Sequence, residues 1–227
     1  IIIDGKKSAS RVKTQIANEL KRSGKQLGLG TILVGNDPGS VAYVEGKHRD
    51  CAEVGIDSIK INLTSSASQS EIIEAVNSLN QNKKCTGFIV QLPLPKSVNV
   101  QAVLEQIDPN KDADGLHPTN LGNLVLGKNP VIPCTPSAIL ALLREYKVNL
   151  DGAKVLIIGR GTTVGRPLSI LLSQKAVNAT VTLAHTGTKD LLNLISSADI
   201  IIAALGSAHF LKPEMVKSGT IVIDVGI

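Results

Sequence analysis

Short runs of aliphatic residues alternate with helix-like patterns along this 227-residue chain, and this alternation restricts its fold more than any other feature. The runs at 29–35 (LGTILVG), 56–63 and 87–91 are typical of buried strands, and amphipathic stretches separate them. Aromatic residues make up only 2% of a chain that is 43% hydrophobic, so its core must consist of Ile, Leu, Val and Ala. Because such strands suit a parallel sheet covered by helices, the sequence predicts an α/β fold with right-handed crossovers.

The alternation occurs twice, and a stretch rich in proline and glycine, 108–136, lies between the two occurrences. The sequence predicts an irregular loop at the start of this stretch and a domain junction near residue 130. We therefore expect two domains, 1–130 and 131–227, and the second has the strand and helix pattern of a Rossmann-like parallel sheet. Helices are expected at 8–26, 40–54, 69–82 with a Ser68–Glu71 capping box, 99–107, 136–146, after Gly165 to about Ser173, and 188–197, and further strands at 155–159, 180–184, 200–204 and 221–225.

The composition argues against several classes of function. The net charge of +5 is scattered along the chain, which has no Trp, two Tyr and two Phe, so an anionic small ligand fits better than nucleic acid. The four histidines lack metal-ligand spacing, so we expect no metal. The sequence contains no run of about 18 apolar residues and no basic leader, so neither a membrane span nor a signal peptide is expected. Cys51, Cys85 and Cys134 form no CxxC pair, which favours a reducing, cytoplasmic compartment.

A glycine-rich turn follows the strand expected at 155–159. Gly159, Gly161 and Gly165 stand where this strand passes into a helix. Glycines in such a turn let the backbone approach a pyrophosphate close to the free N–H groups of the helix. A simple tight turn is the alternative, but the strand–turn–helix context favours a dinucleotide site.

The type of dinucleotide depends on the end of the following strand, at 184–188. An NAD site usually carries Asp or Glu there for the ribose hydroxyls, and this segment has neither. Arg160 and Thr186, with Lys189 nearby in the sequence, could instead bind a 2′-phosphate. The sequence therefore favours NADP over NAD, unless Arg160 is simply a solvated surface residue.

The helix expected at 40–54 carries Ser40, Tyr43 and Lys47 at i, i+3 and i+7, on one face. A tyrosine beside a lysine can supply an aromatic wall and a proton-transfer group, because a partly buried lysine loses its charge more easily. By spacing alone, a surface lysine lying over a tyrosine is the simpler interpretation.

Two further segments place polar groups in special turns. Gln91 ends a predicted strand in the string VQLPLP, where parallel folds place ligand contacts, although an exposed amide in a structural turn is the alternative. The string KDADG contains Asp112 and Asp114, which could bind a cation or cap a helix. One buried carboxylate could also hold the paired N–H groups of a pterin. On the residues alone, an Asx-type turn is the simpler reading.

Taken together, these segments resemble the bifunctional methylenetetrahydrofolate dehydrogenase/cyclohydrolase family. The resemblance covers nearly all 227 residues in the family's order. It implies an N-terminal αβα folate-binding domain, a Rossmann-like NADP-binding domain, a folate cleft between them, and a homodimer. It also implies oxidation of methylenetetrahydrofolate to methenyltetrahydrofolate by hydride transfer to NADP, followed by hydrolysis to formyltetrahydrofolate. The strings that carry it are IIDGK, VGNDPGSVAYVEGKHRDCAEVGI, GFIVQLPLP, KDADGLHPTNLG, PCTP, GRGTTVGRP and GTIVIDVGI.

The same resemblance implies a role for each site residue. Lys47 is the central catalytic residue, Tyr43 stacks against the folate rings, and Gln91 hydrogen-bonds Lys47 and helps to set its protonation state. Asp114 anchors the pterin. Val90 and Leu92 join the substrate-binding residues, and the positions that match cofactor contacts are Gly159, Arg160, Gly161, Thr186 and Ile227.

The chain also departs from the family pattern. Gly161 stands where many members have Ser, and Arg49 stands where Lys is frequent. The family continues beyond DVGI with a strand, a PVPGGVGPMT-like loop and a returning helix, so we expect that segment to be missing after Ile227. Two alternatives stay open: a dehydrogenase without hydrolytic activity, possibly NAD-linked, and an inert fragment that only binds ligands or a partner subunit.

Overall fold

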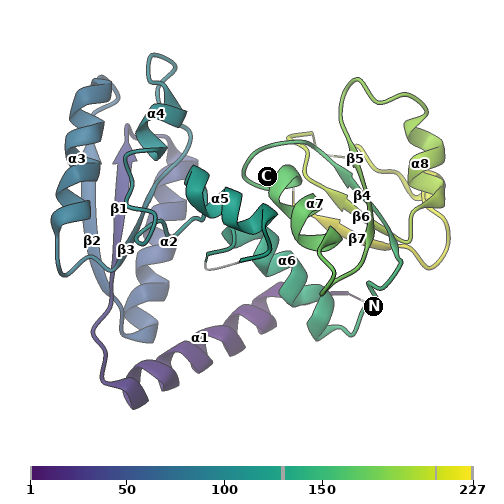
Figure 1. The fold of residues 1–227 in the computed structure, drawn as a ribbon, viewed down its shortest axis with the longest axis horizontal. Helices are drawn as coiled ribbons and strands as arrows, with labels where there is room; N and C mark the ends of the chain where they lie inside the picture. The colour runs from purple at the N-terminus through teal and green to yellow at the C-terminus, as the bar shows by residue number, and fades with distance from the viewer. Residues whose placement is uncertain (1, 129–130, 208, 226–227) are drawn as a thin grey trace. The chain divides into compact units, whose positions relative to one another are not determined.

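The structure, a computed structural model, describes residues 2–128, 131–207 and 209–225. The chain divides after Thr119 into two compact units, and each unit is built around its own parallel sheet (Figure 1). The predicted two-domain α/β fold is therefore confirmed. The boundary expected near residue 130 stays a prediction, because residues 129 and 130 are not described. Among the described helices, none combines the length and the apolar composition needed to cross a bilayer.

The first unit contains a three-stranded parallel sheet in the order β2-β1-β3. The chain leaves the central strand β1 (Gly28–Val34) for β2 (Asp57–Leu63) on one side and later returns to β3 (Gly87–Val90) on the other. Such a reversal of strand order marks the sheet edge at which α/β folds bind ligands. The helices of this unit are α1 (Gly5–Ser23), α2 (Pro38–Val54), α3 (Gln69–Gln81) and α4 (Val100–Leu104).

Local sequence signals fix the ends of these helices. The predicted capping box of α3 is confirmed: the Ser68 hydroxyl accepts from the Glu71 N–H at 3.3 Å, and the Glu71 carboxylate accepts from the Ser68 N–H at 2.7 Å. Gly55 ends α2 with a φ of +86°, a conformation that favours glycine. The helix expected at 8–26 begins instead at residue 5, because Asp4 caps it, and ends before Gly24, which has a φ of +64°.

The core of the first unit lies between the sheet and α3. Ile32 from β1 and Phe88 from β3 are fully buried with Ile72 and Leu79 from α3. Each such side chain contributes roughly 1.5–3 kcal/mol by leaving water. This packing gives the strand ends a rigid base.

The second unit contains a four-stranded parallel sheet in the order β5-β4-β6-β7. The chain passes from β4 to β5 on one side and then to β6 on the other, so a second reversal of strand order lies at β4. Figure 1 shows α7 and α8 on opposite sides of this sheet. The elements are α6 (Cys134–Glu145), β4 (Lys154–Ile158), α7 (Gly165–Ser173), β5 (Thr180–Ala184), α8 (Leu191–Ser197), β6 (Ile200–Ala203), a 3₁₀ turn (Pro213–Met215) and β7 (Ile221–Asp224).

One prediction about the intervening stretch is wrong. The sequence predicts an irregular loop through the string HPTN, and the structure instead has helix α5 (Pro118–Val125). Pro118 suits the first helical position because its φ is fixed and the missing N–H would have no helical partner there. Burial of Leu124, which is 0% exposed, supplies the packing that this short helix needs.

Candidate functional site

The first unit brings Lys47 and Gln91 together. Lys47 extends from α2, and its Nζ donates to Oε1 of Gln91 at 3.0 Å. Gln91 directly follows β3, and its N–H still bonds to the Ile32 carbonyl of β1 at 2.9 Å. The Gln91 side-chain Nε2 donates to the Leu92 carbonyl at 2.8 Å, so the amide is held with its oxygen toward the lysine.

Tyr43 lies beside this pair on the same helix. The Lys47 Nζ is 5.1 Å from the centroid of the Tyr43 ring, within the range of a cation–π contact. Tyr43 is 58% exposed, which leaves ring surface available to a flat ligand. Ser40 does not join the pair, because its N–H and hydroxyl bond to the Asp37 carboxylate at 2.8 and 2.9 Å and cap the helix. These bonds lower the pKa of Asp37.

Val90 and Leu92 flank Gln91 but face the protein interior. Val90 is 2% exposed and belongs to the core cluster of the first unit, and Leu92 packs against that cluster. Their assignment as substrate contacts stays a prediction.

The two aspartates of the DADG string have different surroundings. Asp112 is 3% exposed, and its carboxylate accepts from the N–H groups of Gly115 at 3.0 Å and His117 at 2.8 Å. The Asx-type turn therefore belongs to Asp112. Among the described residues, none donates a hydrogen bond to Asp114, which is half-buried.

The pKa of Asp114 is raised, first by burial of its carboxyl group. Nearby Lys47 opposes the shift and Asp112 adds to it. The structure thus places Asp114 within electrostatic reach of the lysine that Gln91 holds. A carboxylate that no described residue hydrogen-bonds, within electrostatic reach of an oriented amine, is an arrangement able to accept paired N–H donors of a flat heterocycle.

Sequence reasoning missed Lys111. Its Nζ donates to the carbonyl oxygens of Leu79, Asn80 and Asn82, at 3.1, 2.7 and 2.9 Å, at the carboxyl end of α3. A lysine is a common partner for the last carbonyls of a helix, but nothing in the sequence indicates which of the many lysines meets α3. This contact anchors the start of the turn that carries Asp114.

The glycine turn of the second unit follows β4 directly. Gly159 has a φ of +124°, and a Cβ there would lie 2.2 Å from the Ala204 carbonyl oxygen. A Cβ on Gly165 would lie 1.8 Å from the Gly159 carbonyl oxygen. Gly161 has open space around it, with only the Thr163 hydroxyl near, at 3.9 Å. Backbone packing therefore requires glycine at positions 159 and 165, whereas position 161 has space for a small side chain.

The turn leads into α7, whose amino end has no side-chain cap. Pro167 has no N–H, and the Arg166 N–H bonds to the Gly161 carbonyl at 3.0 Å, so the N–H groups that remain for an anion lie in the turn before the helix. Arg160 and Thr186 are exposed, and no described residue bonds to either side chain. The segment around Thr186 is fixed because His185 Nδ1 accepts from the Gly187 N–H at 3.0 Å and the His185 N–H bonds to Thr188 Oγ1 at 2.8 Å. Ile227 lies outside the described residues.

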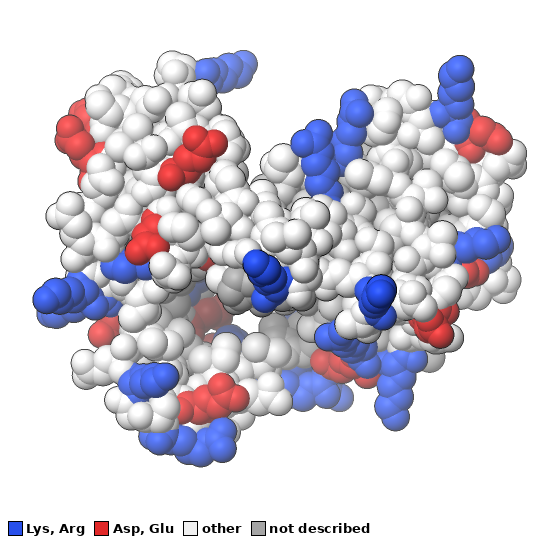
Figure 2. Space-filling model, viewed as in Figure 1, with Lys and Arg blue, Asp and Glu red and all other residues white. Residues whose placement is uncertain are grey.

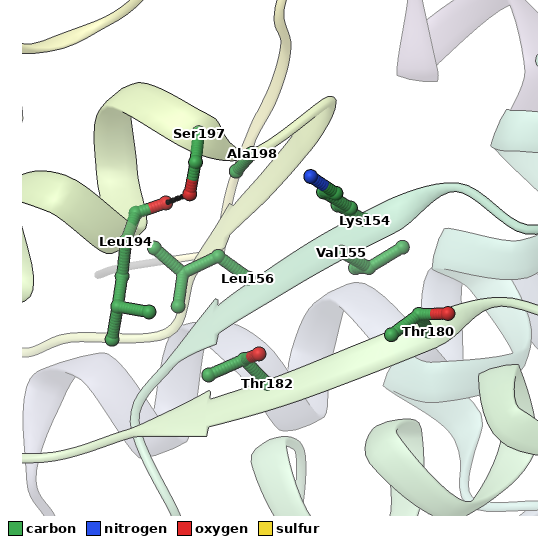
Figure 3. A pocket seen from close by; sticks show the side chains of 8 residues that line it. All are labelled: Lys154, Val155, Leu156, Thr180, Thr182, Leu194, Ser197 and Ala198. Atoms are coloured by element: carbon green, nitrogen blue, oxygen red, sulfur yellow. Dashed lines mark hydrogen bonds between the residues drawn. The ribbon is translucent and has the colours of Figure 1, made fainter.

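A pocket of about 230 Å³ in the second unit contains none of the predicted site residues (Figure 3). Lys154 and Thr180, which line it, are the first residues of β4 and β5, whereas the glycine turn follows the last residue of β4. The pocket is therefore at the opposite end of the strands from the dinucleotide motif. Figure 2 shows Lys and Arg dispersed among Asp and Glu on the visible face, without the cluster of basic residues there that nucleic-acid binding requires.

The sequence matches two domain families. Residues 3–114 match the catalytic domain of tetrahydrofolate dehydrogenase/cyclohydrolase, and residues 133–227 match the NAD(P)-binding domain of tetrahydrofolate dehydrogenase/cyclohydrolase.

Several solved structures are similar along the whole chain. The bifunctional FolD methylenetetrahydrofolate dehydrogenase/cyclohydrolase of Campylobacter jejuni is 39% identical, with a TM-score of 0.95, over 100% of this chain and 81% of that one. The Trypanosoma brucei FolD, solved with NADP cofactor and an inhibitor, is 34% identical with a TM-score of 0.94 over 100% and 78%. The bifunctional enzyme of Thermoplasma acidophilum is 30% identical with a TM-score of 0.93 over 100% and 81%.

Proposed function

Because this chain belongs to the tetrahydrofolate dehydrogenase/cyclohydrolase family, we propose that it oxidises 5,10-methylenetetrahydrofolate to 5,10-methenyltetrahydrofolate with NADP⁺ and then hydrolyses the product to 10-formyltetrahydrofolate. The observation that carries this proposal is the Lys47–Gln91 hydrogen bond of 3.0 Å beside the exposed Tyr43 ring. In this assignment Tyr43 stacks on the pterin, and the Asp114 carboxylate accepts its ring and amino N–H groups.

The residues of the second unit fit a dinucleotide. Gly159 and Gly165 bring the backbone too close together for any Cβ, and the turn before α7 offers N–H groups to a pyrophosphate. Arg160 and Thr186, both without a described partner, would hold the 2′-phosphate of NADP. When bound, NADP⁺ accepts a hydride from the methylene carbon. Ile227 stays a proposed contact.

Lys47 handles protons in the hydrolytic step. Water attacks the electrophilic methenyl carbon, and the amine accepts the proton that the water loses. The amine then returns that proton to N5. As the bond between N5 and the carbon breaks, the new hydroxyl oxygen forms the C=O bond and its proton passes to solvent, which leaves the formyl group on N10. Gln91 contributes by holding one N–H of the lysine, which fixes the direction of the amine.

Replacing Lys47 by Met tests this assignment. General acid–base groups typically contribute 10²–10⁴-fold, so the rate of methenyltetrahydrofolate hydrolysis should fall by roughly that factor. The affinity for NADP should stay within about twofold, since Lys47 lies in the other unit from the glycine turn. Absorbance decay of the methenyl compound measures hydrolysis, and Lys25→Met, an exposed lysine, is the control. Full hydrolysis by Lys47→Met would refute the role.

The same proposal includes the setting of the enzyme. We infer a homodimer that works in the cytoplasm, with folate-binding and NADP-binding domains at 1–130 and 131–227. The free, buried thiols of Cys51 and Cys85 support a reducing compartment. Analytical ultracentrifugation over a range of concentrations tests the dimer, and a monomer at all concentrations would contradict it.

A further inference from the structure

The two carboxylates of the DADG turn have separate tasks. Both oxygens of Asp112 are used inside the turn, one by the Gly115 N–H and the other by the His117 N–H. Its side chain is only 3% exposed, so it has little surface to offer a ligand. Asp114 receives no hydrogen bond from a described residue and is only half-buried.

The turn is attached to the strand that carries Gln91. The Phe88 N–H of β3 bonds to the Lys111 carbonyl at 2.8 Å, and the Ala113 N–H bonds to the Phe88 carbonyl at 3.2 Å. Gly115 then reverses the chain with a φ of +71°, and the Asp112 carboxylate holds that reversal. Asp114 lies between these two fixed points, so its direction depends on the Asp112 bonds.

We propose that Asp112 is a positioning residue for Asp114, which fixes the direction of that carboxylate and sets the pH range over which the chain binds its pterin substrate. The inference rests on the proposed function, because it takes Asp114 as the group that accepts the pterin N–H donors. Asp112 itself touches no reacting atom.

Electrostatics supplies the link to pH. Burial raises the pKa of Asp114, Lys47 from α2 lowers it, and Asp112 from the same loop raises it further. A protonated Asp114 loses acceptor capacity, so the KM for folate rises as pH falls through the pKa of Asp114. Removing the Asp112 charge lowers that pKa, and the rise in KM must then move to lower pH.

Asp112→Asn tests the proposal. The amide keeps one oxygen acceptor but turns an NH₂ donor toward the second backbone N–H, so one charge-assisted bond is lost. We expect the KM for methylenetetrahydrofolate to rise roughly tenfold at neutral pH with kcat nearly unchanged, and its acidic rise to move to lower pH. Unchanged KM, or an acidic rise at the wild-type pH, would overturn the inference. If Asp112→Asn does not fold, Asp112→Ser removes the charge and keeps a hydroxyl acceptor.

Two further variants separate the possible causes. Gly115→Ala strains the left-handed turn but leaves the Asp112 charge in place, so its KM should rise while the pH of the acidic rise stays fixed. If Gly115→Ala moved the acidic rise in KM to lower pH as far as Asp112→Asn does, the geometry of the turn alone would control the pH range and the role of the Asp112 charge would be refuted. Asp114→Asn tests the proposed function itself: if it leaves KM unchanged, the pterin assignment fails independently of Asp112.

Discussion

Replacing Lys111 by Met should destabilise the first unit strongly. The Lys111 ammonium donates to three carbonyl oxygens at the end of α3, at 2.7–3.1 Å, and the same residue begins the turn that carries Asp114. Methionine keeps much of the aliphatic stem but removes all three donors. The variant therefore isolates the polar contribution of this side chain.

The magnitude follows from the number and kind of these bonds. A hydrogen bond to a charged group contributes about 1.5–3 kcal/mol, but three bonds to one half-buried ammonium are not additive, because water can reach part of the exposed helix end. We expect a loss of roughly 2–4 kcal/mol in the free energy of unfolding of this unit. For a unit of 119 residues, each kcal/mol lowers Tm by about 4 °C, so Tm should fall by roughly 8–16 °C.

Differential scanning calorimetry of the full chain measures the shift, and hydrogen exchange should show that protection is lost first at the end of α3. Lys83→Met is the matched control, since Lys83 is exposed and lies near the same helix end. A loss below about 0.5 kcal/mol, or one no larger than that of the control, would refute the reasoning.

Three further predictions follow from other parts of the chain. Gly165→Ala should weaken NADP binding at least roughly tenfold, because its Cβ would lie 1.8 Å from the Gly159 carbonyl oxygen. Gly161→Ala places its Cβ in open space and should change the dissociation constant only about twofold. A fluorescence titration measures both constants. The pKa of His48 is lowered by burial and then by Lys60 and Lys47, so the unfolded state binds more protons than the folded state. The free energy of unfolding should therefore fall as pH drops below about 6.5. In urea unfolding, His48→Leu should show a weaker dependence of this free energy on pH. Burial raises the pKa of Cys51 and Cys85, so a thiol reagent should label exposed Cys134 first. Equal labelling rates for all three cysteines in the native chain would contradict the packing.

Features that depend on neighbouring residues could be predicted from the sequence. The Ser68–Glu71 capping box, the helix stop at Gly55 and the glycine turn after β4 all lie where the local pattern places them. The start of α1 and the whole of α5 were not predicted, because their signals are a single cap at Asp4 and the burial of Leu124. Helix ends and short helices depend on contacts that a local pattern does not contain.

The sequence by itself determined the two successive series of alternating strands and helices, since these depend on hydrophobic periodicity. It also indicated Tyr43, Lys47 and Gln91 as site residues, since these lie in recognisable strings. Only the tertiary structure decided that the Lys47 amine meets Gln91, 44 positions away along the chain. It also decided that Asp112 closes the turn while Asp114 receives no hydrogen bond from a described residue. The physical reason is that strand order and burial select the partner of each polar group. A buried carboxylate must find N–H donors, and which of two aspartates is buried depends on how the loop packs against β3.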